Sequence, residues 1–288
     1  MTASVAFALD SKPAISVLMA VYNAPKNYLD AAIVSILHQS YRDFEFIIVD
    51  DGSDVAASKY LQSRAVGDER IRLLKLPANV GLTRALNAGL QLARGDYLAR
   101  QDADDISEPH RLSAQLWFLA MHPDIDAVGT DAVLIDAGGN EFGVMQIDPD
   151  LKRLSRRNLL VHGSMLFRRR VFEQLGGYDE RMRLSQDYEL YLRMIRLHGM
   201  RIGVMPEAHY RLRQHRDSLS SRRMFRQLYY SVIAKSLTQQ YNSRLGRRLG
   251  FWRDITVDIF FTHRLFIGSV MRGVIGNRKM TTSTRPAK

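Results

Sequence analysis

The first half of the chain alternates short apolar runs with segments whose apolar residues repeat at helical spacing. Strands are expected at 15–21, 44–49, 71–76, 96–100 and 125–135, and helices at 28–37, 82–92 and 110–122. Strands that alternate with helices pair in parallel through right-handed crossovers, so this order predicts an α/β fold. We expect a mostly parallel central sheet with helices on both faces.

The second half of the chain is less regular. A helix is expected at 169–175, where Gly176 and Gly177 end it, and a second helix at 186–198. From Arg222 onward helical spacing returns, which predicts a C-terminal helical extension.

The bulk composition narrows the class of protein. A chain of 288 residues can form one large domain with an appendage, or two small domains. The absence of cysteine excludes a disulfide framework and a thiolate metal site. The N-terminus lacks the pattern of a secretory signal, and no uncharged apolar stretch reaches the ~18 residues typical of a membrane span.

The positive charge lies almost wholly in the last quarter of the chain. Residues 1–210 contain 24 Lys and Arg against 27 Asp and Glu, a net charge of −3. Residues 211–288 contain 17 against 3, a net charge of +14. Such a block suits a polyanionic partner, either anionic lipid or nucleic acid, and it equally suits a solvated basic face.

Two acidic clusters directly follow predicted strands, where open parallel sheets bind their ligands. The first is Asp50-Asp51-Gly52-Ser53. Taken alone it suits a turn or a helix cap as well as a carboxylate that accepts hydrogen bonds from a nucleobase or ribose. The second is Asp102-Ala103-Asp104-Asp105.

The second cluster carries the stronger signal. In an extended chain Asp102 and Asp104 point to the same side and repel each other unless a cation or protons neutralise them. Mg²⁺ or Mn²⁺ with substrate phosphates would complete an oxygen shell there. A solvated acidic loop is the alternative for an isolated cluster, and two clusters at equivalent strand ends favour the ligand site.

The ordered series of motifs resembles the family 2 inverting glycosyltransferases, which have the GT-A fold. The resemblance covers about residues 14–220, and the order and spacing of the segments make it specific. The matching segments are ISVLMAVYNAP, FEFIIVDDGSD, ANVGLTRALNAGLQLARGDYLARQDADD, HGSMLFRRRVFEQLGGYDE, SQDYELYLR and RQHRDSLSS.

The resemblance implies a donor pocket for a nucleotide-diphosphate sugar, with UDP as the expected nucleotide. Asp50 and Asp51 would hold the nucleoside. The other donor-binding residues would be Ala20, Tyr22, Asn23, Arg84, Asn87 and Asp102.

The resemblance also implies a divalent cation, Mg²⁺ or Mn²⁺. Asp102 and Asp104 match the family's DxD motif, with Asp104 as the main metal ligand and Asp102 nearer the ribose. His215 matches a histidine that approaches the metal or the diphosphate.

Asp187 matches the family's catalytic base, although the chain has Gln186 where the family usually has Glu. A favourable charge at a helix N-terminus is the structural alternative for Asp187. His162 is expected either to contact the acceptor or to be a packed histidine. Tyr178 is expected in the turn after a helix, where it could line the acceptor pocket.

These implications predict a GT-A catalytic domain at 1–220, with a nucleotide-sugar half at about 13–106 and an acceptor half at about 107–220. The expected reaction is inverting transfer of one hexosyl or N-acetylhexosaminyl group to a hydroxyl of a glycan or lipid-linked acceptor, as in bacterial surface-glycan synthesis. The chain lacks the Gln-x-x-Arg-Trp motif of processive synthases, which favours single transfers.

The tail at 221–288 is basic overall. Within it, residues 251–275 are mostly apolar and are flanked by basic residues. Such a helix suits a membrane interface, and it suits packing on the catalytic domain or a homodimer equally well. We expect a cytoplasmic protein, attached to the inner face of the cell membrane under the first alternative.

Two rival functions remain. A sugar nucleotidyltransferase would share the nucleotide and metal but normally has a Gly-rich loop, which residues 20–25 lack; a dehydrogenase G-x-G-x-x-G motif is absent too. A non-enzymatic polyanion binder that used the tail would leave the acidic clusters unexplained. No nucleic-acid partner is therefore expected.

Overall fold

The computed structural model describes residues 12–148, 151–214 and 224–240. All of them lie in the first of the two units into which the chain divides, residues 1–242. The strands are β1 (Ile15–Val21), β2 (Phe44–Asp50), β3 (Ile71–Lys75), β4 (Tyr97–Arg100), β5 (Ile106–Ser107), β6 (Ala127–Ile135), β7 (Glu141–Met145), β8 (Leu166–Arg168) and β9 (Ile202–Arg213). The helices are α1 (Lys26–Leu37), α2 (Val55–Gly67), α3 (Leu82–Leu92), α4 (Arg111–Met121), α5 (Arg169–Leu175), α6 (Gln186–His198) and α8 (Met224–Gln240), with 3₁₀ turns η1 (Leu151–Ser155) and η2 (His162–Ser164).

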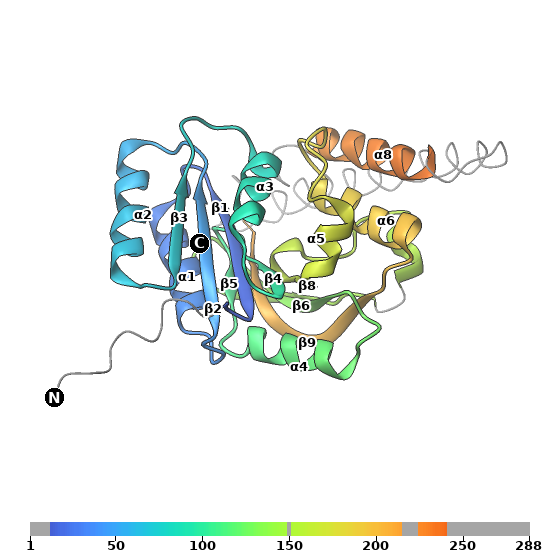
Figure 1. Ribbon diagram of the computed structural model, residues 1–288, viewed down its shortest axis with the longest axis horizontal. Helices are drawn as coiled ribbons and strands as arrows, with labels where there is room; N and C mark the ends of the chain where they lie inside the picture. Colours follow the sequence, from blue (N-terminus) through green and yellow to red (C-terminus); the bar gives the residue numbers. More distant parts are fainter. Residues whose placement is uncertain (1–11, 149–150, 215–223, 241–288) are drawn as a thin grey trace, which may run out of the picture. The chain divides into compact units, whose positions relative to one another are not determined.

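Within the described residues the strands form one sheet in the order β3-β2-β1-β4-β8-β6-β9-β5, and β7 pairs with β6 (Figure 1). The strands β1, β2, β3 and β4 of the first half pair with one another in parallel. Antiparallel pairing begins where β8 joins β4. The parallel block therefore brings the carboxyl ends of β2, β1 and β4 to one edge of the sheet.

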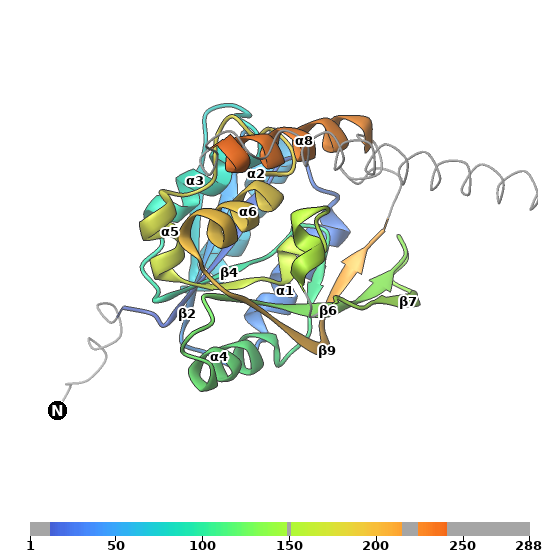
Figure 2. The same cartoon turned by 90° about the vertical axis from the view of Figure 1, so that its right-hand side faces the viewer.

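Alternating side chains along the strands form two hydrophobic cores, one on each face of the sheet. Ile15, Val17 and Met19 of β1 pack with α1, α2 and α4. Leu18 faces the opposite way and packs with α3, α5 and α6. Because successive side chains of a strand point to opposite faces, one buried strand serves both cores. Helices accordingly cover both faces (Figure 2).

The structure confirms the predicted α/β fold with helices on both faces, and each strand and helix expected in the first half is present. It also contains elements that were not expected, namely α2, β5, β7, β8 and β9. The longest unexpected strand is β9, and its register with β6 shifts twice near Asp131. Its burial pattern is irregular and its middle contains Pro206 and Glu207, so it lacks the apolar run or strict alternation of a predictable strand.

Helix α8 is the described part of the predicted 221–288 extension. Ala234 and Thr238 on this helix are buried, and Thr238 accepts a hydrogen bond from Arg196 of α6. Helix α8 therefore packs on the catalytic core. The amphipathic segment at 251–275 lies outside the described residues, and the boundary at residue 220 stays a prediction.

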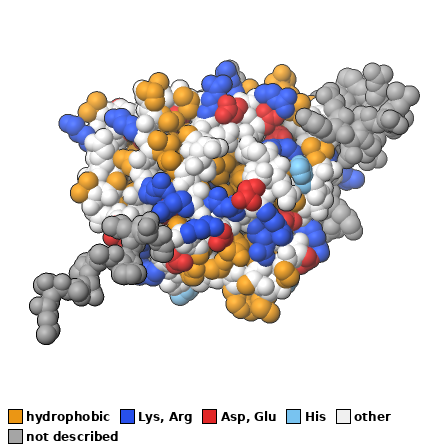
Figure 3. Space-filling model, viewed as in Figure 1, with side chains coloured by type: hydrophobic (Ala, Val, Ile, Leu, Met, Phe, Trp, Pro, Cys, Tyr) orange, Lys and Arg blue, Asp and Glu red, His pale blue; other side chains and the backbone are white. Residues whose placement is uncertain are grey.

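Figure 3 shows basic and acidic side chains interspersed on the face that it presents. This mixing agrees with the small net charge of residues 1–210. Within the part of the chain that the structure describes, no helix is both long enough and apolar enough to cross a membrane.

Candidate active site

Asp50 is the last residue of β2 and has a carboxylate oxygen without a protein partner. Its side chain is fully buried, and Oδ1 accepts a hydrogen bond from the Ser53 backbone N–H at 2.9 Å. Oδ2 is also buried and has no hydrogen-bond partner within the described residues. Because an unsatisfied buried acceptor is costly, Oδ2 is a candidate acceptor for a ligand N–H or O–H.

Asp51 uses its carboxylate to hold the loop before α3. Its oxygens accept hydrogen bonds from Asn79 Nδ2 at 3.0 Å, from Val80 N at 2.7 Å and from Gly81 N at 3.0 Å. Gly52 beside it has a φ of 70°, and a Cβ there would lie 2.4 Å from the Ala78 carbonyl carbon. The DDGS turn and the residue 78–81 loop are thus in close contact, and Asp51 fixes one against the other.

Asn23 joins the ends of β1 and β2. Its backbone has a φ of 48°, its N–H donates to Ser53 Oγ at 3.1 Å, and its Oδ1 accepts from the Asp54 N–H at 2.8 Å. Asp54 itself caps α2 through the Ala57 N–H. Near Asn23, Tyr22 is 53% exposed, so its ring is available to a ligand at this edge.

Arg100 at the end of β4 anchors the loop that carries Asp102 and Asp104, the DxD loop. Its guanidinium is buried, and Nη2 lies 2.5 Å from Asp102 Oδ1. Burial raises the pKa of Asp102, the Arg100 charge opposes that shift, and the Asp104 charge adds to it. The net shift of this pKa is upward because burial of Asp102, the largest cause, outweighs the opposing charge of Arg100.

Asp105 lies behind the DxD pair. Burial and the charges of Asp104 and Asp102 raise the pKa of Asp105 well above its usual range. Asp105 Oδ1 accepts the Arg213 backbone N–H at 2.7 Å, and the Arg213 guanidinium donates to the Asp104 carbonyl at 2.8 Å. The end of β9 therefore clamps the DxD loop.

Asp102 and Asp104 would offer carboxylate oxygens to a hard cation. Their oxygens are the ligand type that Mg²⁺ or Mn²⁺ prefers, and their mutual repulsion would be relieved by a bound cation. Within the described ranges no group of three or more His, Asp or Glu side chains is arranged to hold a metal by itself. The carboxylates thus fit a cation whose remaining ligands come from a substrate.

Asp187 lies in the first turn of α6. Asn158 Nδ2 donates to its Oδ2 at 2.6 Å, and the Tyr188 N–H also donates to this carboxylate. Burial raises the pKa of Asp187, hydrogen bonds oppose the shift, and the charge of Asp102 adds to it. Asp187 and Asp102 therefore lie within electrostatic reach of each other although they are far apart in the sequence.

His162 and Tyr178 line the same region and contact each other. His162 Nε2 lies 2.9 Å from the Tyr178 hydroxyl. Burial and the nearby Arg100 charge lower the pKa of His162 well below its usual range, so the ring is neutral at pH 7. Tyr191, one helical turn after Asp187, packs edge-on against His162, and its buried hydroxyl has no hydrogen-bond partner among the residues that the structure describes.

Asn87 and Arg84 of α3 contact the turn that carries Tyr178. Asn87 Nδ2 donates to the Tyr178 carbonyl and its Oδ1 accepts the Tyr178 N–H, both at 2.9 Å. Arg84 forms an exposed ion pair with Glu180 at 3.2 Å. Asn87 therefore bridges the two halves of the domain.

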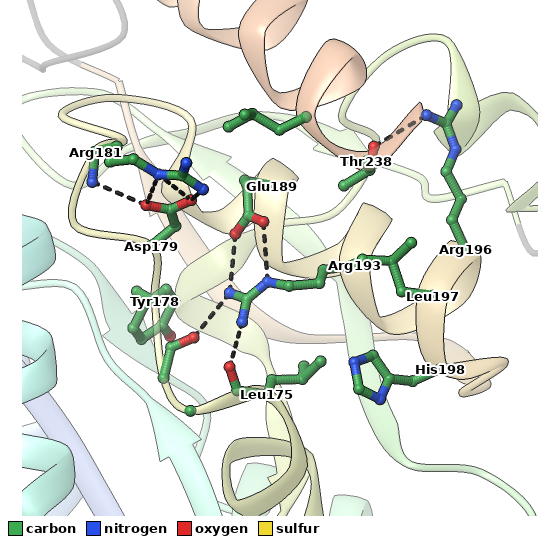
Figure 4. Close-up of a pocket in the computed structure, with 13 residues that line it drawn as sticks. Leu175, Tyr178, Asp179, Arg181, Glu189, Arg193, Arg196, Leu197, His198 and Thr238 are labelled. Atoms are coloured by element: carbon green, nitrogen blue, oxygen red, sulfur yellow. Dashed lines mark hydrogen bonds and ion pairs between the residues drawn. The ribbon is translucent and has the colours of Figure 1, made fainter. Parts of the chain in front are cut away.

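A pocket of about 570 Å³ lies elsewhere, next to the Tyr178 turn and against α6 and α8 (Figure 4). Two ion pairs lie at this pocket, Arg193 with Glu189 and Arg181 with Asp179. The acidic strand ends do not line it. His215 lies outside the described residues, so its predicted approach to the metal remains a prediction.

Sequence reasoning left four site residues without a role, namely Arg100, Asp105, Asn158 and Tyr191. Arg100 is the last residue of a buried strand. Because a charged side chain is rarely buried without a partner, its position could have indicated that it pairs with a nearby carboxylate. Tyr191 follows Asp187 by four residues on one helix face, which spacing could also have shown. Nothing in the local sequence marks Asn158.

The sequence profile described as Glycosyl transferase family 2 matches residues 16–176. EpsE of Bacillus subtilis is 34% identical over 278 residues, which are 94% of this chain and 94% of that protein. The amylovoran biosynthesis glycosyltransferase AmsE of Erwinia amylovora is 28% identical over 243 residues, 83% of this chain and 88% of that protein.

Among solved structures, the chain resembles the mannosyltransferase PcManGT from Pyrobaculum calidifontis in complex with GDP-Man and Mn²⁺. The TM-score is 0.63 at 19% identity, and the match covers 88% of this chain and 71% of the other. This likeness supports the GT-A fold. The chain therefore belongs to Glycosyl transferase family 2 and is a glycosyltransferase.

Proposed function

We propose that the chain is a metal-dependent, inverting glycosyltransferase that moves one sugar from a nucleotide-diphosphate sugar to an acceptor hydroxyl. The observation that carries the proposal is a contact between the two sites: a Cβ on Gly163 would lie 2.9 Å from Asp102 Oδ2, and the neighbouring His162 packs against Tyr191 on α6, the helix that carries Asp187. Displacement of a nucleoside diphosphate by an acceptor hydroxyl needs a base for the hydroxyl proton and a site that stabilises the leaving group.

The donor pocket lies at the ends of β1, β2 and β4. The unpartnered Asp50 Oδ2 accepts a hydrogen bond from the nucleoside, and Asp51 acts on it mainly through the loop that it holds. The proposed pocket also includes Ala20, Tyr22, Asn23, Arg84 and Asp102, and Asn87 borders it while its side chain holds the Tyr178 backbone. UDP is the proposed nucleotide on the family resemblance. GDP is the alternative to test, because PcManGT binds GDP-Man.

The metal site is proposed at Asp104 and Asp102, with His215 as a further ligand. A bound Mg²⁺ or Mn²⁺ would stabilise the charge that develops on the diphosphate leaving group. The carboxylates of the loop provide hard oxygen ligands, Arg100 fixes the orientation of Asp102, and Arg213 fixes the backbone at Asp104.

Asp187 is the proposed base. A positioned general base is typically worth ~10²–10⁴-fold in rate, and a raised pKa brings the Asp187 carboxylate closer to the working pH. Asn158 orients its Oδ2. Attack from the face opposite the leaving group inverts the sugar carbon.

The acceptor side comprises His162 and Tyr178, whose contact is made by a neutral ring and an un-ionised hydroxyl. Such groups suit hydrogen bonds to sugar hydroxyls. We propose a hexosyl or N-acetylhexosaminyl transfer to a glycan or lipid-linked acceptor, in line with AmsE, which is named for amylovoran biosynthesis. A lipid-linked acceptor would place the protein at the inner membrane face through residues 241–288.

A thermal-shift screen with UDP-glucose, UDP-galactose, UDP-GlcNAc and GDP-mannose, with and without Mn²⁺, tests the metal site. We expect stabilisation by one nucleotide class that requires Mn²⁺ and is lost in Asp104→Asn. The matched control is Asp96→Asn, the same change at the amino end of β4. Mn²⁺-dependent binding that survives Asp104→Asn would contradict the metal assignment.

A further inference from the structure

Helix α6, which carries Asp187, begins in an unusual way. Ser185 precedes its first residue and has a φ of 55° and a ψ of 27°, in the left-handed region. Serine before a helix is normally extended and accepts a backbone N–H through its hydroxyl, but Ser185 makes no such cap. A non-glycine residue keeps a strained left-handed conformation only where its surroundings hold it.

Helix α8 provides those surroundings. Ser185 Oγ lies 3.1 Å from the Gln227 carbonyl oxygen, to which it donates, and 3.2 Å from Ser231 Oγ. Ser231 Oγ lies 2.8 Å from the same carbonyl, and because its single proton can instead go to Ser185 Oγ, the two hydroxyls and the carbonyl form one hydrogen-bonded cluster. Ser185 is only 6% exposed, so water competes little for these contacts. The hydroxyl that would ordinarily cap α6 is instead used to bind α8.

A second contact fixes α8 at the other end of α6. Arg196 Nη1 donates to Thr238 Oγ1 at 3.1 Å (Figure 4), and Nη2 donates to the Ser155 carbonyl at 3.2 Å. Residues 227, 231, 234 and 238 share one face of α8, since they are three or four apart. Ala234 and Thr238 on this face are buried. The contact at Ser185 is thus part of a specific interface between the two helices.

The backbone at Ser185 sets the direction of the turn that holds Asp187. The Ser185 carbonyl accepts the Glu189 N–H at 3.0 Å, which closes the first turn of α6. The Asp187 carboxylate accepts backbone N–H groups of that same turn, so it moves with the turn. A change at Ser185 would therefore displace the carboxylate.

We propose that α8 positions the catalytic base: Ser231 and the Gln227 carbonyl hold Ser185 left-handed and thereby aim Asp187 at the acceptor hydroxyl. The proposal rests on the role of Asp187 in the proposed function. Ser185 and Ser231 are positioning residues, and α8 is part of the active-site structure although the matched family profile ends at residue 176.

Four variants test the proposal with two measurements. The first is hydrogen exchange of the peptide that spans 184–192. The second is hydrolysis of the nucleotide sugar that stabilises the wild type most in the thermal-shift screen. Ser185→Ala loses the hydroxyl and resists a positive φ. Ser185→Gly and Ser231→Ala lose only the contact to α8, and Ser185→Asn keeps a hydrogen-bonding group and tolerates the left-handed region. Tyr229→Ala, on the exposed side of α8, is the matched control.

We expect turnover to fall ~10–100-fold in Ser185→Ala, less in Ser185→Gly and Ser231→Ala, and little in Ser185→Asn and the control. Exchange should accelerate in the same order, while KM for the nucleotide sugar and the affinity for UDP with Mn²⁺ stay within about twofold, because the contact aims Asp187 without binding the donor.

Two results separate this proposal from the proposed function. Unchanged exchange and turnover in both Ser185→Gly and Ser231→Ala would overturn the role of α8. Accelerated exchange with unchanged turnover would also overturn the positioning role, whereas unchanged turnover in Asp187→Asn would remove Asp187 as the base and with it the proposed function.

Discussion

The half of the described chain that holds the proposed donor site and the half that holds the proposed acceptor site are built in different ways. In the first half, parallel strands that follow one another along the chain place Asp50, Asp51 and Asp102 at one sheet edge. In the second half, polar contacts between distant segments hold Asp187 and Tyr178 in place. The difference teaches that strand ends alone can supply a donor site, whereas the acceptor side depends on contacts made only in the folded chain.

Asn87→Ala should cause a larger loss of stability than Glu45→Gln, a change confined to one half, because it removes the side chain that bridges the halves. Two hydrogen bonds to the Tyr178 backbone would be lost, at a cost of about 2–3 kcal/mol. Urea denaturation measures this loss. Gln91→Ala, an exposed amide one turn along α3, should change the free energy of unfolding by no more than about 0.5 kcal/mol.

The same variant sharpens the comparison between the halves. If Asn87 acts as a bridge, UDP affinity of the folded variant stays within about threefold of the wild type. A large loss of UDP affinity at full stability would instead assign Asn87 to the nucleotide alone and break the comparison.

Glu45→Gln should have a smaller effect, confined to the first half. Glu45 on β2 is buried and accepts hydrogen bonds from Ser16, Arg72 and Arg94. Burial raises the pKa of Glu45, and these hydrogen bonds outweigh it, so the net shift is downward. A lowered folded-state pKa stabilises the fold above the unfolded-state value, and this stabilisation is lost as pH falls through the folded-state value.

Denaturation of Glu45→Gln and the wild type from pH 7 to pH 3 checks the direction of this pH dependence. The free energy of unfolding should be about 1 kcal/mol lower in the variant at pH 7, and this difference should shrink below the unfolded-state pKa of ~4.3. Glu69→Gln, an exposed carboxylate on the same half, is the control. A difference that grows as the pH falls would contradict the proposed hydrogen-bond network.

The sequence predicts the first half well because its strands and helices follow local periodicity. The runs 15–21 and 44–49 match β1 and β2 within one residue, and the two acidic clusters follow strands as expected. Helix α6 was also predicted, and its bounds of 186 and 198 match.

Strand β9 and the polar contacts of the second half could not be predicted, because they depend on residues far apart in the sequence. Strand β9 pairs with β6 through a shifted register around Pro206, and neither feature leaves a periodic signal. The contacts Asn158–Asp187 and Ser185–Ser231 join residues separated by 29 and 46 positions. Only the folded chain shows that these polar residues meet.

The central claim is that the strand-end carboxylates and Asp187 form one site around a cation-bound diphosphate. A crystal structure with UDP and Mn²⁺, with the metal located by anomalous scattering, tests it most directly. The account predicts a manganese peak beside Asp104, the nucleoside at Asp50 Oδ2, and the Asp187 carboxylate facing the diphosphate. Manganese or nucleotide bound away from Asp104 and Asp50, with Asp187 facing neither, would contradict it.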